Sequence, residues 1–379
     1  MTRTVLIGGG GTAGHVFPAL AVGEALRGSD ADVEPVFVGV ADRLEARLVP
    51  EAGFRLHHIE AASVPRRPTP ALLKVPGVLR GAVRRCREIA EEEAAAGVIT
   101  FGGYVSFPLN RAAARSSLPL IVHEQNSVPG LANRVSARWA DRIAVTFPGS
   151  ATRFKDLERC VVTGNPVRAD VLALDRAAAR PAARAAFGLD PDLPTLLVFG
   201  GSQGARSINQ AVADAHGRWG QVPVQILHAA GDQGHGSAAE AWDRARAEHP
   251  DGPPVQLVDF IRDMASAYAA ADVVVCRAGA TSIAELTVLG IPSVLVPYPH
   301  ATADHQTENG RALERAGGAT VVADADLDGA SLFAAVRPLL EDAQRYEAMA
   351  RSARAFGRPD AAELLAGLVL ELIDGGRQS

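Results

Sequence analysis

A histidine at the start of a predicted helix is the first residue of the chain that could do chemistry. His15 follows the glycine-rich loop 8–14, which comes directly after the apolar run Thr4 to Ile7. The dipole at a helix start disfavours a protonated imidazole, and a general base must be neutral before it takes a proton. His15 is therefore a candidate base beside a bound ligand. A structural hydrogen-bond donor is the alternative, and the residues alone leave both open.

Polar side chains also follow a later apolar run, Leu120 to Val122. His123, Glu124 and Asn126 belong to the tetrapeptide HEQN that comes next. Four polar residues directly after a strand favour a binding site over ordinary turn chemistry. The segment 102–106, with the sequence GGYVS, is a further glycine-rich turn between a predicted strand and a predicted helix. The residues do not decide whether this segment is only a structural turn or part of a binding site.

The second half of the chain contains a glycine turn and a carboxylate that suit a nucleotide. Ser202, Gln203 and Gly204 open a predicted helix, whose main-chain N–H groups could bind a diphosphate without a metal. Glu285 lies three residues after Ser282, the spacing of a capping box. A carboxylate near a helix start could also bind the hydroxyls of a ribose, and both interpretations stay open. No acidic pair follows a strand in a convincing context, so no divalent-metal site is expected.

Short apolar runs alternate with helical patterns along the whole chain, and this order positions the polar residues. It predicts α/β domains with parallel sheets, in which ligands bind at the carboxyl ends of the strands. A polar loop, His300 to Asn309, follows one of the last strands. The predicted strands are 4–7, 34–39, 56–59, 97–100, 119–123, 142–146 and 160–163, then 195–199, 224–229, 255–258, 272–276, 293–296 and 319–321.

The opening pattern of strand, glycine turn and helix occurs twice, the second time over 195–217. Two copies predict two similar domains that face each other across a cleft. We expect an N-terminal domain over 1–166 and a C-terminal domain over 167–356. The alanine-, arginine- and proline-rich segment 173–193 is interpreted as a linker with a short helix. An amphipathic helix over 357–375 is expected to return to the first domain.

The composition is that of an ordinary soluble protein of 379 residues, with a net charge of −5 that gives no reason to expect nucleic acid as a partner. The three cysteines are isolated and predict reduced packing residues in a cytoplasmic protein. No stretch reaches the roughly 18 apolar residues of a membrane-spanning helix, so any membrane contact should be peripheral.

Residues 61–87 contain basic side chains, no acidic side chain, and interleaved leucines and valines. An apolar face rimmed by positive charge predicts binding to an anionic membrane surface. The alternative is a helix that packs on the core and exposes a solvated basic face. The residues concerned are Arg66, Arg67, Lys74, Arg80, Arg84, Arg85 and Arg87, with Leu72, Leu73, Val75, Val78, Leu79 and Val83 between them.

Seven segments in this order resemble the MurG family of peptidoglycan N-acetylglucosaminyltransferases. They are GGGTAGHVFPALAVGEAL, GGYVSFP, HEQNSVPGLANR, GNPVR, GGSQGARSIN, DFIRDM, and CRAGATSIAEL through PYPHATADHQTENG. The resemblance implies the GT-B architecture of two Rossmann-like domains, with no cofactor and no essential metal. It implies an inverting transfer of GlcNAc from UDP-GlcNAc to the C4 hydroxyl of MurNAc in lipid I, which gives lipid II. The implied partners are those two substrates, the cytoplasmic face of the cell membrane and cell-wall synthesis proteins.

Site residues follow from the same resemblance, motif by motif. His15 matches the proposed base, and Glu124 and Asn126 are assigned to catalysis with it. Arg168 lies at the interdomain junction and is expected to sense the nucleotide. The acceptor and cleft positions are Thr12, Ala13, Gly14, Tyr104, His123, Asn126 and Asn133. The donor positions are Ser202 and Gln203 (diphosphate), Ile261 (uracil), Glu285 (ribose), Ala280 and Thr281 (diphosphate and sugar), and Gln306 and Asn309 (sugar hydroxyls).

Three other functions compete with this one. A dehydrogenase is disfavoured because the first loop fits G-x-G-x-x-G only loosely and no acidic residue ends the second predicted strand. A related transferase of antibiotic biosynthesis shares several motifs, and a UDP-sugar-binding regulator would bind the donor without turnover. Two departures from the family pattern, Ala13 in the first loop and His305 in the last, leave the details of acceptor binding open.

Overall fold

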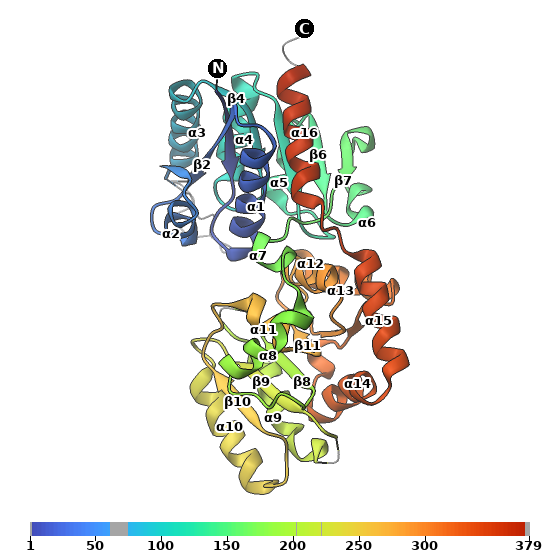
Figure 1. Ribbon diagram of the computed structural model, residues 1–379. Helices are drawn as coiled ribbons and strands as arrows, with labels where there is room; N and C mark the ends of the chain where they lie inside the picture. Colours follow the sequence, from blue (N-terminus) through green and yellow to red (C-terminus); the bar gives the residue numbers. More distant parts are fainter. Residues whose placement is uncertain (1, 61–74, 202, 221, 376–379) are drawn as a thin grey trace. The chain divides into compact units, whose positions relative to one another are not determined.

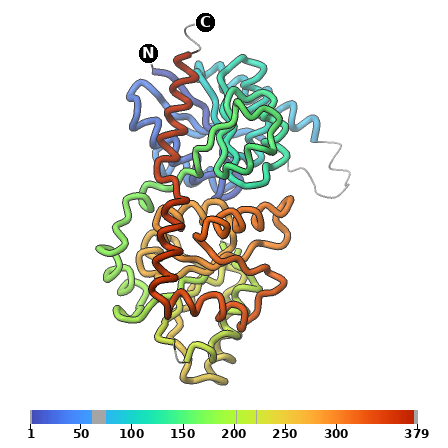
Figure 2. The backbone as a smooth tube through the Cα atoms, turned by 90° about the vertical axis from the view of Figure 1, so that its right-hand side faces the viewer, coloured from blue at the N-terminus to red at the C-terminus, as the bar shows by residue number. Residues whose placement is uncertain are grey.

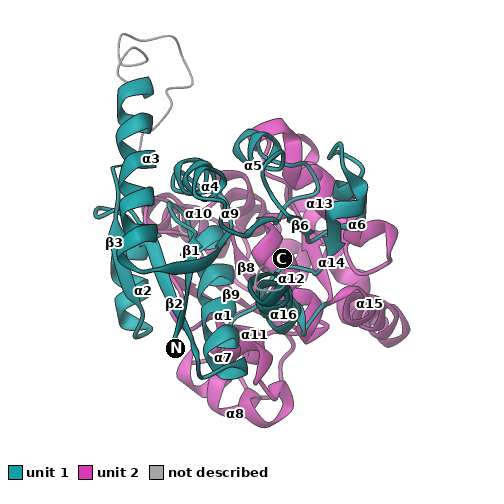
Figure 3. Ribbon diagram, turned by 90° about the horizontal axis from the view of Figure 1, so that it is seen from above, with its two compact units in different colours: residues 1–168, 358–379 teal, residues 169–357 magenta. Residues whose placement is uncertain are grey.

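The computed structural model describes residues 2–60, 75–201, 203–220 and 222–375 (Figure 1). The chain forms two compact units (Figure 3). Unit 1 consists of Met1–Arg168 and Arg358–Ser379, and unit 2 consists of Ala169–Gly357. Ser202, one of the predicted diphosphate residues, lies outside the described residues, as does 61–74, the first part of the basic segment 61–87.

Unit 1 alternates strands and helices. Its elements are β1 (Arg3–Gly8), α1 (Ala13–Ser29), β2 (Val33–Gly39), α2 (Leu44–Glu51), β3 (Arg55–His58), α3 (Val75–Glu92), β4 (Ala95–Thr100), α4 (Ser106–Arg115), β5 (Leu120–Glu124), α5 (Leu131–Ser136), β6 (Arg142–Val145), α6 (Pro148–Ala151), the 3-10 turn η2 (Leu157–Arg159), β7 (Cys160–Val162) and, from the far end of the chain, α16 (Ala361–Gly375).

Unit 2 repeats the alternation. Its elements are α7 (Ala169–Leu172), α8 (Arg176–Ala186), β8 (Thr195–Phe199), α9 (Arg206–Asp214), η3 (His216–Trp219), β9 (Gln225–Ala229), α10 (His235–Glu248), β10 (Val255–Val258), α11 (Met264–Ala270), β11 (Val273–Cys276), α12 (Ala280–Leu289), β12 (Ser293–Leu295), η4 (Thr302–Asp304), α13 (His305–Arg315), β13 (Thr320–Val321), η5 (Asp324–Asp326), α14 (Gly329–Glu341) and α15 (Ala343–Phe356).

The two sheets share one strand order. Unit 1 has seven strands in the order β3-β2-β1-β4-β5-β6-β7, and unit 2 has six in the order β10-β9-β8-β11-β12-β13. Neighbouring strands pair in parallel throughout both sheets. This order is that of nucleotide-binding Rossmann folds, so the predicted class, α/β with two Rossmann-like domains, is confirmed. Each predicted strand appears, with ends within two residues of the prediction.

Both faces of the unit 1 sheet are covered by helices. Val5 and Ile7 of β1 pack in one buried cluster with side chains of α1 and α16, whereas Leu6 packs in another with side chains of α3 and α4. Alternate residues of a strand point to opposite faces, so an apolar run without polar interruption is what this position requires. α16 lies along α1, and Arg3 forms an ion pair with Asp374 near the ends of the chain (Figure 2).

The segment 173–193 contains the predicted short helix, α8, but the prediction of a linker is wrong, because the whole segment belongs to unit 2. α8 packs against α11, and the guanidinium group of Arg184 is almost fully buried. Arg180 and Arg184 both form ion pairs with Asp272, at 2.6 and 2.8 Å. An arginine repeated every fourth residue lies on one side of a helix, so α8 presents its charges to the body of unit 2.

Two other expectations need correction. The predicted polar loop 300–309 is mostly helical, because η4 and the first turns of α13 occupy 302–309. The helix expected over 205–217 is α9, which ends at Asp214 and is followed by η3. Ala303 and Asp304 join η4 to α13 in the left-handed region, with φ of +52° and +53°. This backbone is strained for residues with a side chain.

Helix α3 differs from the expected lipid-facing helix in one respect. Val83 is 6% exposed and packs in the core cluster of unit 1, so it cannot contact lipid. Arg84, Arg85 and Arg87 form ion pairs with glutamates one or two turns further along the helix, Glu88, Glu91 and Glu92. None of the described helices is long and apolar enough to span a bilayer.

Candidate functional site

Each sheet reverses its strand order at one point, and the predicted residues follow the strands on either side of it. In unit 1 the reversal lies between β1 and β4, and in unit 2 it lies between β8 and β11. Ligands of such sheets bind outside the carboxyl ends of these strands. The loops after β1 and β4 contain GGTAGH and GGYVS, and those after β8 and β11 contain GGSQG and RAGAT.

The loops after β1 and β4 contact each other through glycine. Gly103 has a φ of +82°, and a Cβ atom there would lie 2.2 Å from the carbonyl oxygen of Gly10. A Cβ atom on Gly102 would lie 2.9 Å from Nε2 of His15. Only glycine permits this approach, and it leaves the imidazole of His15 directly over the second loop.

His15 and Thr12 are neighbours in space. Oγ1 of Thr12 lies 3.0 Å from Nδ1 of His15, while Thr12 and Ala13 are exposed and Gly14 is half-buried. When Nδ1–H donates to the threonine, the lone pair of Nε2 can accept a proton, which is the tautomer a base requires. Tyr104 is 44% exposed, and its ring lies 3.4 Å from the Cβ position of Gly11. The structure thus brings four predicted acceptor residues together.

Glu45 is a buried carboxylate that the sequence interpretation missed. It is fully buried on α2, where one oxygen accepts from the N–H of Gly11 at 2.9 Å and the other from the N–H of Val40 at 3.2 Å. The first glycine loop is therefore held in place by the hydrogen bond between the N–H of Gly11 and this buried carboxylate. A glutamate thirty-four residues from its partner gives no local signal in the sequence.

Glu124 stabilises its own loop. It is 2% exposed and accepts from the N–H groups of Asn126 and Gly130, at 2.9 and 3.0 Å, and from Nδ2 of Asn133 at 2.9 Å. Burial raises the pKa of this carboxyl, and the hydrogen bonds oppose the rise. A catalytic part for Glu124 and Asn126 stays a prediction. The geometry shows a carboxylate that positions the loop after β5.

His123 lies below the surface, and its assignment as an acceptor-side residue stays a prediction. Its side chain is fully buried, and Nε2 lies 3.0 Å from the carbonyl oxygen of Gly164. Burial lowers the pKa of His123 to about 4, so the ring is neutral and Nε2–H is the donor. Asn133 is also buried and donates to the carbonyl of His123 at 3.1 Å. Both residues stabilise the strand ends from within.

In unit 2, glycines again bring two loops together. Gly204 has a φ of +77°, and a Cβ atom there would lie 2.0 Å from the carbonyl oxygen of Ala230, in the loop after β9. Gln203 is exposed beside it. Asn209 donates from Nδ2 to the same carbonyl at 2.9 Å, and His228 lies 3.1 Å from Oδ1 of Asn209.

A buried hydrogen-bond chain continues from His228. The indole N–H of Trp242 donates to Nδ1 of His228 at 2.9 Å, so the proton of the neutral ring is on Nε2 and points to Asn209. Burial lowers the pKa of His228 to about 4. The carbonyl of Ala230, against which the glycine turn packs, is thereby fixed to the core of the unit.

The turn after β11 leads straight into α12, and the expected capping box is absent. Gly279 is the N-cap, without a side-chain cap bond, and Ser282 already lies in the first turn. Two predicted donor residues begin the helix. Ala280 is 6% exposed, and the buried hydroxyl of Thr281 has no hydrogen-bond partner among the described residues. An unpaired hydroxyl beside exposed helical N–H groups suits an anionic ligand.

Arg277 is directed into the protein. Its guanidinium pairs with Asp324 at 2.5 Å, donates to Ser207 of α9 at 3.1 Å, and donates to the carbonyl of Pro297 at 3.1 Å. Three segments at the carboxyl edge of the sheet are thereby joined. The sequence interpretation did not assign a part to any of these residues.

Glu285 lies one and a half turns into α12 and is 6% exposed. The hydroxyl of Tyr268, on α11, donates to its Oε2 at 2.8 Å. Ile261 precedes α11 and is 5% exposed, and Asp263 caps that helix by accepting from the N–H of Ser266 at 3.0 Å. The predicted uracil and ribose residues are therefore connected through one short helix.

The remaining predicted residues vary in accessibility. Oε1 of Gln306 accepts from the N–H of Tyr298 at 2.9 Å. Asn309 is fully buried and lies 3.3 Å from the carbonyl of Ala278, so it stabilises the turn after β11. Its assignment to the sugar hydroxyls stays a prediction. In unit 1, the guanidinium of Arg168 lies 5.0 Å from the centre of the Phe17 ring.

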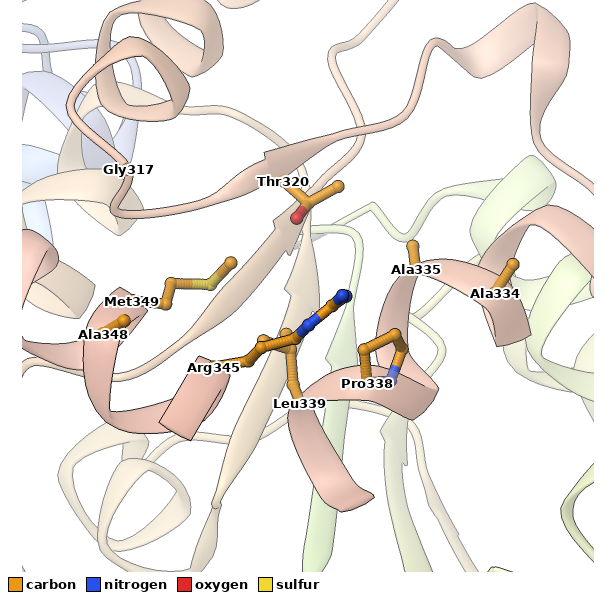
Figure 4. A pocket seen from close by; sticks show the side chains of 9 residues that line it. All are labelled: Gly317, Thr320, Ala334, Ala335, Pro338, Leu339, Arg345, Ala348 and Met349. Atoms are coloured by element: carbon orange, nitrogen blue, oxygen red, sulfur yellow. The ribbon is translucent and has the colours of Figure 1, made fainter. Parts of the chain in front are cut away.

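A hollow of about 390 Å³ lies elsewhere in unit 2, among β13, α14 and α15 (Figure 4). Arg345 is its one charged side chain, beside Pro338, Leu339 and Met349. Predicted site residues do not line it, and its mainly apolar wall offers few donors for a phosphate. Within the described ranges, no group of three histidine, cysteine, aspartate or glutamate side chains could hold a metal ion.

Two family models match the chain. Residues 5–145 match the glycosyltransferase family 28 N-terminal domain, and residues 195–365 match the C-terminal domain of the same family. Together the two matches span most of both units.

Two curated relatives bear the same name, UDP-N-acetylglucosamine–N-acetylmuramyl-(pentapeptide) pyrophosphoryl-undecaprenol N-acetylglucosamine transferase. The one from Nocardioides is 47% identical over 97% of this chain and 98% of its own, and that from Acidothermus cellulolyticus is 46% identical over 96% of each. The crystal structure of Acinetobacter baumannii MurG superposes with a TM-score of 0.75 at 28% identity, covering 97% of this chain and 99% of its own. The chain belongs to the MurG family.

The matched family consists of glycosyltransferases, so the chain is a glycosyltransferase. A MurG family member must bind two substrates, and this chain offers one glycine-lined edge in each unit. His15, Thr12 and Tyr104 gather at the edge of unit 1. Thr281 and Glu285 belong to the edge of unit 2.

Proposed function

We propose that the protein is an inverting glycosyltransferase that moves GlcNAc from UDP-GlcNAc to the C4 hydroxyl of MurNAc in lipid I, and so forms lipid II. The observation that carries this proposal is the 47% identity, over 97% of the chain, to a relative named for this transfer. The geometry of both units supports it.

Unit 2 provides the donor site in this proposal. The start of α9 after Gly204 and the start of α12 at Ala280 offer N–H groups for the diphosphate. The hydroxyl of Thr281, which has no partner in the described part of the chain, lies beside the second of them. Glu285 accepts hydrogen bonds from the ribose, and the main chain of Ile261 contacts uracil. The N–H groups and helix dipoles stabilise the negative charge of the leaving diphosphate. In this proposal the reaction therefore needs no cofactor and no metal.

Unit 1 provides the base. Nε2 of His15 takes the proton from the C4 hydroxyl while that oxygen attacks C1 of GlcNAc from the face opposite UDP. The C1–O bond to UDP breaks, UDP leaves with the bonding electrons, and the new link is β1→4. Thr12 orients the imidazole through its contact at 3.0 Å with Nδ1. Glu45 fixes the glycine loop that precedes His15, and Glu124 fixes the loop after β5.

Unit 1 also provides the membrane contact, because lipid I has a polyprenyl anchor. On α3, Arg80 is exposed and Leu79 is half-buried. The guanidinium groups of Arg111 and Arg138 lie 5.0 and 5.2 Å from the centre of the Trp139 ring. Tryptophan and arginine together are typical of surfaces that meet lipid headgroups. We propose peripheral binding to the cytoplasmic face of the cell membrane, beside other cell-wall synthesis proteins.

The test is release of UDP from UDP-GlcNAc in detergent solution, with and without lipid I. We expect one UDP per lipid II formed, and none without the acceptor. His15→Ala should lower kcat by about 10²- to 10⁴-fold, because general base catalysis is lost. His58→Gln, which removes an exposed imidazole from unit 1, is the control. Binding of UDP-GlcNAc without turnover would show a regulator, and transfer only to other acceptors would show an antibiotic-pathway enzyme.

A further inference from the structure

We infer that Tyr268 is a positioning residue for the donor, and that its hydroxyl fixes the carboxylate of Glu285 in the orientation that binds the two hydroxyls of a ribose. The inference rests on the proposed donor site in unit 2. It adds a residue that lies outside the glycine turns and would not touch the nucleotide.

The contact itself is short and buried. Tyr268 is fully buried and Glu285 is 6% exposed, and the phenol donates to Oε2 at 2.8 Å. A buried hydrogen bond to a charged acceptor is stronger than one in water, and it restricts rotation of the carboxylate. Two hydroxyls of one ribose must meet the carboxylate in a single plane, so a fixed rotation favours their binding.

The tyrosine is itself held from two sides. Its ring packs at 6.4 Å from Phe199, the last residue of β8 before the glycine turn. Its carbonyl oxygen accepts from Nε of Arg176 at 3.1 Å. Arg176 and Arg184, both on α8, also donate to the carbonyls of Ala271 and Ala270 at the end of α11. Cationic donors at a helix C-terminus satisfy carbonyls that the helix leaves unpaired.

The position of Tyr268 in the chain gives it a second connection. α11 begins one residue after Asp263, in the segment that contains the proposed uracil contact Ile261. It ends two residues after Tyr268. A single helix of seven residues therefore relates the uracil segment to the ribose carboxylate, and α8 fixes its far end. The pair Tyr268 and Glu285 should accordingly determine how strongly the site prefers a ribose to a 2′-deoxyribose.

The experiment compares Tyr268→Phe with the parent protein in binding UDP and 2′-deoxy-UDP, measured by calorimetry. Loss of the phenol should weaken UDP binding by about tenfold, since a hydrogen bond to a charge is removed. Binding of 2′-deoxy-UDP, which lacks one of the two hydroxyls, should weaken less. The preference for UDP should therefore fall, and kcat at saturating donor should stay near that of the parent.

Thr287→Val is the matched control. It removes another buried hydroxyl from α12, which donates at 2.9 Å to the carbonyl of Ala284, and has no contact with Tyr268 among the described hydrogen bonds. UDP affinity should be retained in this variant, even if its melting temperature falls as far as that of Tyr268→Phe. In a Glu285→Ala background, Tyr268→Phe should cause no further loss of UDP affinity.

The inference is overturned if Tyr268→Phe binds UDP like the parent, or weakens UDP and 2′-deoxy-UDP equally. It is also overturned if the two substitutions weaken binding additively. Failure of the proposed donor site is a distinct result, because the parent itself would then bind neither nucleotide. If the parent binds UDP with preference and Tyr268→Phe behaves like Thr287→Val, the donor site stands and the inference alone fails.

Discussion

The N–H of Gly11 donates to Oε2 of Glu45 at 2.9 Å, across thirty-four residues of sequence. The second carboxylate oxygen accepts from Val40, and the side chain is fully buried. The loop that carries Thr12 and His15 is therefore fixed by a charge beneath it. A Cβ atom on Gly10 would lie 2.4 Å from this carboxylate, so the loop packs too closely on Glu45 for any residue but glycine at position 10.

Glu45→Gln should lower both stability and activity. The amide replaces one acceptor by a donor, so one buried N–H loses its partner at a cost of about 1–3 kcal/mol. We expect a fall of that size in the free energy of unfolding and a higher KM for lipid I, with the affinity for UDP unchanged. Glu51→Gln, which breaks only the exposed ion pair with Arg47 on the same helix, is the control. Equal behaviour of the two variants would contradict a special part for Glu45.

Thr12→Val should lower kcat by about tenfold without affecting stability. The threonine is the N-cap of α1 but makes no side-chain cap bond, so its loss removes only the contact with Nδ1 of His15. A misoriented imidazole is a weaker base, whereas Thr12→Ser keeps the hydroxyl and should keep the rate. Steady-state kinetics on lipid I check this. Equal rates for the valine and serine variants would remove Thr12 from the mechanism.

Glu285→Ala should weaken UDP-GlcNAc binding and also destabilise unit 2. Each hydrogen bond from a ribose hydroxyl to this carboxylate contributes about 1.5–3 kcal/mol. The alanine variant also leaves the buried hydroxyl of Tyr268 without this acceptor, at a cost of about 1–3 kcal/mol in unfolding free energy. Glu285→Gln keeps an acceptor for the tyrosine and separates the two effects. Unchanged nucleotide affinity in both variants would refute the ribose assignment.

Acid should destabilise both units through buried histidines. The pKa of His123 and that of His228 are lowered to about 4 by burial, from an ordinary value of 6.5. Above pH 6.5 the rings are neutral in the folded and unfolded chains, so stability does not depend on them. Between pH 6.5 and 4 only the unfolded chain binds these protons, and unfolding free energy falls by about 1.4 kcal/mol per pH unit and histidine.

Urea unfolding at several pH values measures this slope. His228→Gln should make the transition of unit 2, followed by the fluorescence of Trp219 and Trp242, less steep in pH by about 1.4 kcal/mol per unit. The exposed His58, replaced in the same way, serves as the comparison. A slope equal to that of the parent in the His228 variant would show that this ring is protonated in the folded chain.

Reversal of Arg80, Arg84 and Arg85 to Glu should lower binding to anionic vesicles. Near such a surface each basic residue contributes about 1 kcal/mol, and salt screens the effect. Arg84 and Arg85 already pair with Glu88 and Glu92, so Arg80 should contribute more to vesicle binding than either of them. Activity on a short-chain soluble acceptor should survive. The control reverses three exposed arginines of unit 2, namely Arg244, Arg311 and Arg351.

Strands and glycine turns could be predicted from the sequence because their signals are local. In a chain where strands and helices alternate, an apolar run such as Thr195–Phe199, followed by Gly200 and Gly201, predicts a buried strand that ends in a turn. Glu45 and Tyr268 could not be found in this way, since their parts depend on which helix packs beside which loop. The capping box at Ser282 failed for a related reason. Ser282 and Glu285 have the spacing of a capping box, but α12 begins at Ala280, two residues before Ser282. Gly279 is therefore the N-cap.

The closing helix α16 gives unit 1 a dependence on the order of synthesis. It contributes Leu365, Val369 and Ile373 to the cluster that also contains Val5 and Ile7 of the central strand β1. A ribosome makes β1 first and α16 only after all of Ala169–Gly357. Unit 2 can therefore complete its core during translation, while the sheet of unit 1 has one face covered by α1 but not yet by α16. A stop codon before Ala361 would leave the apolar side chains that pack against Leu365, Val369 and Ile373 permanently exposed.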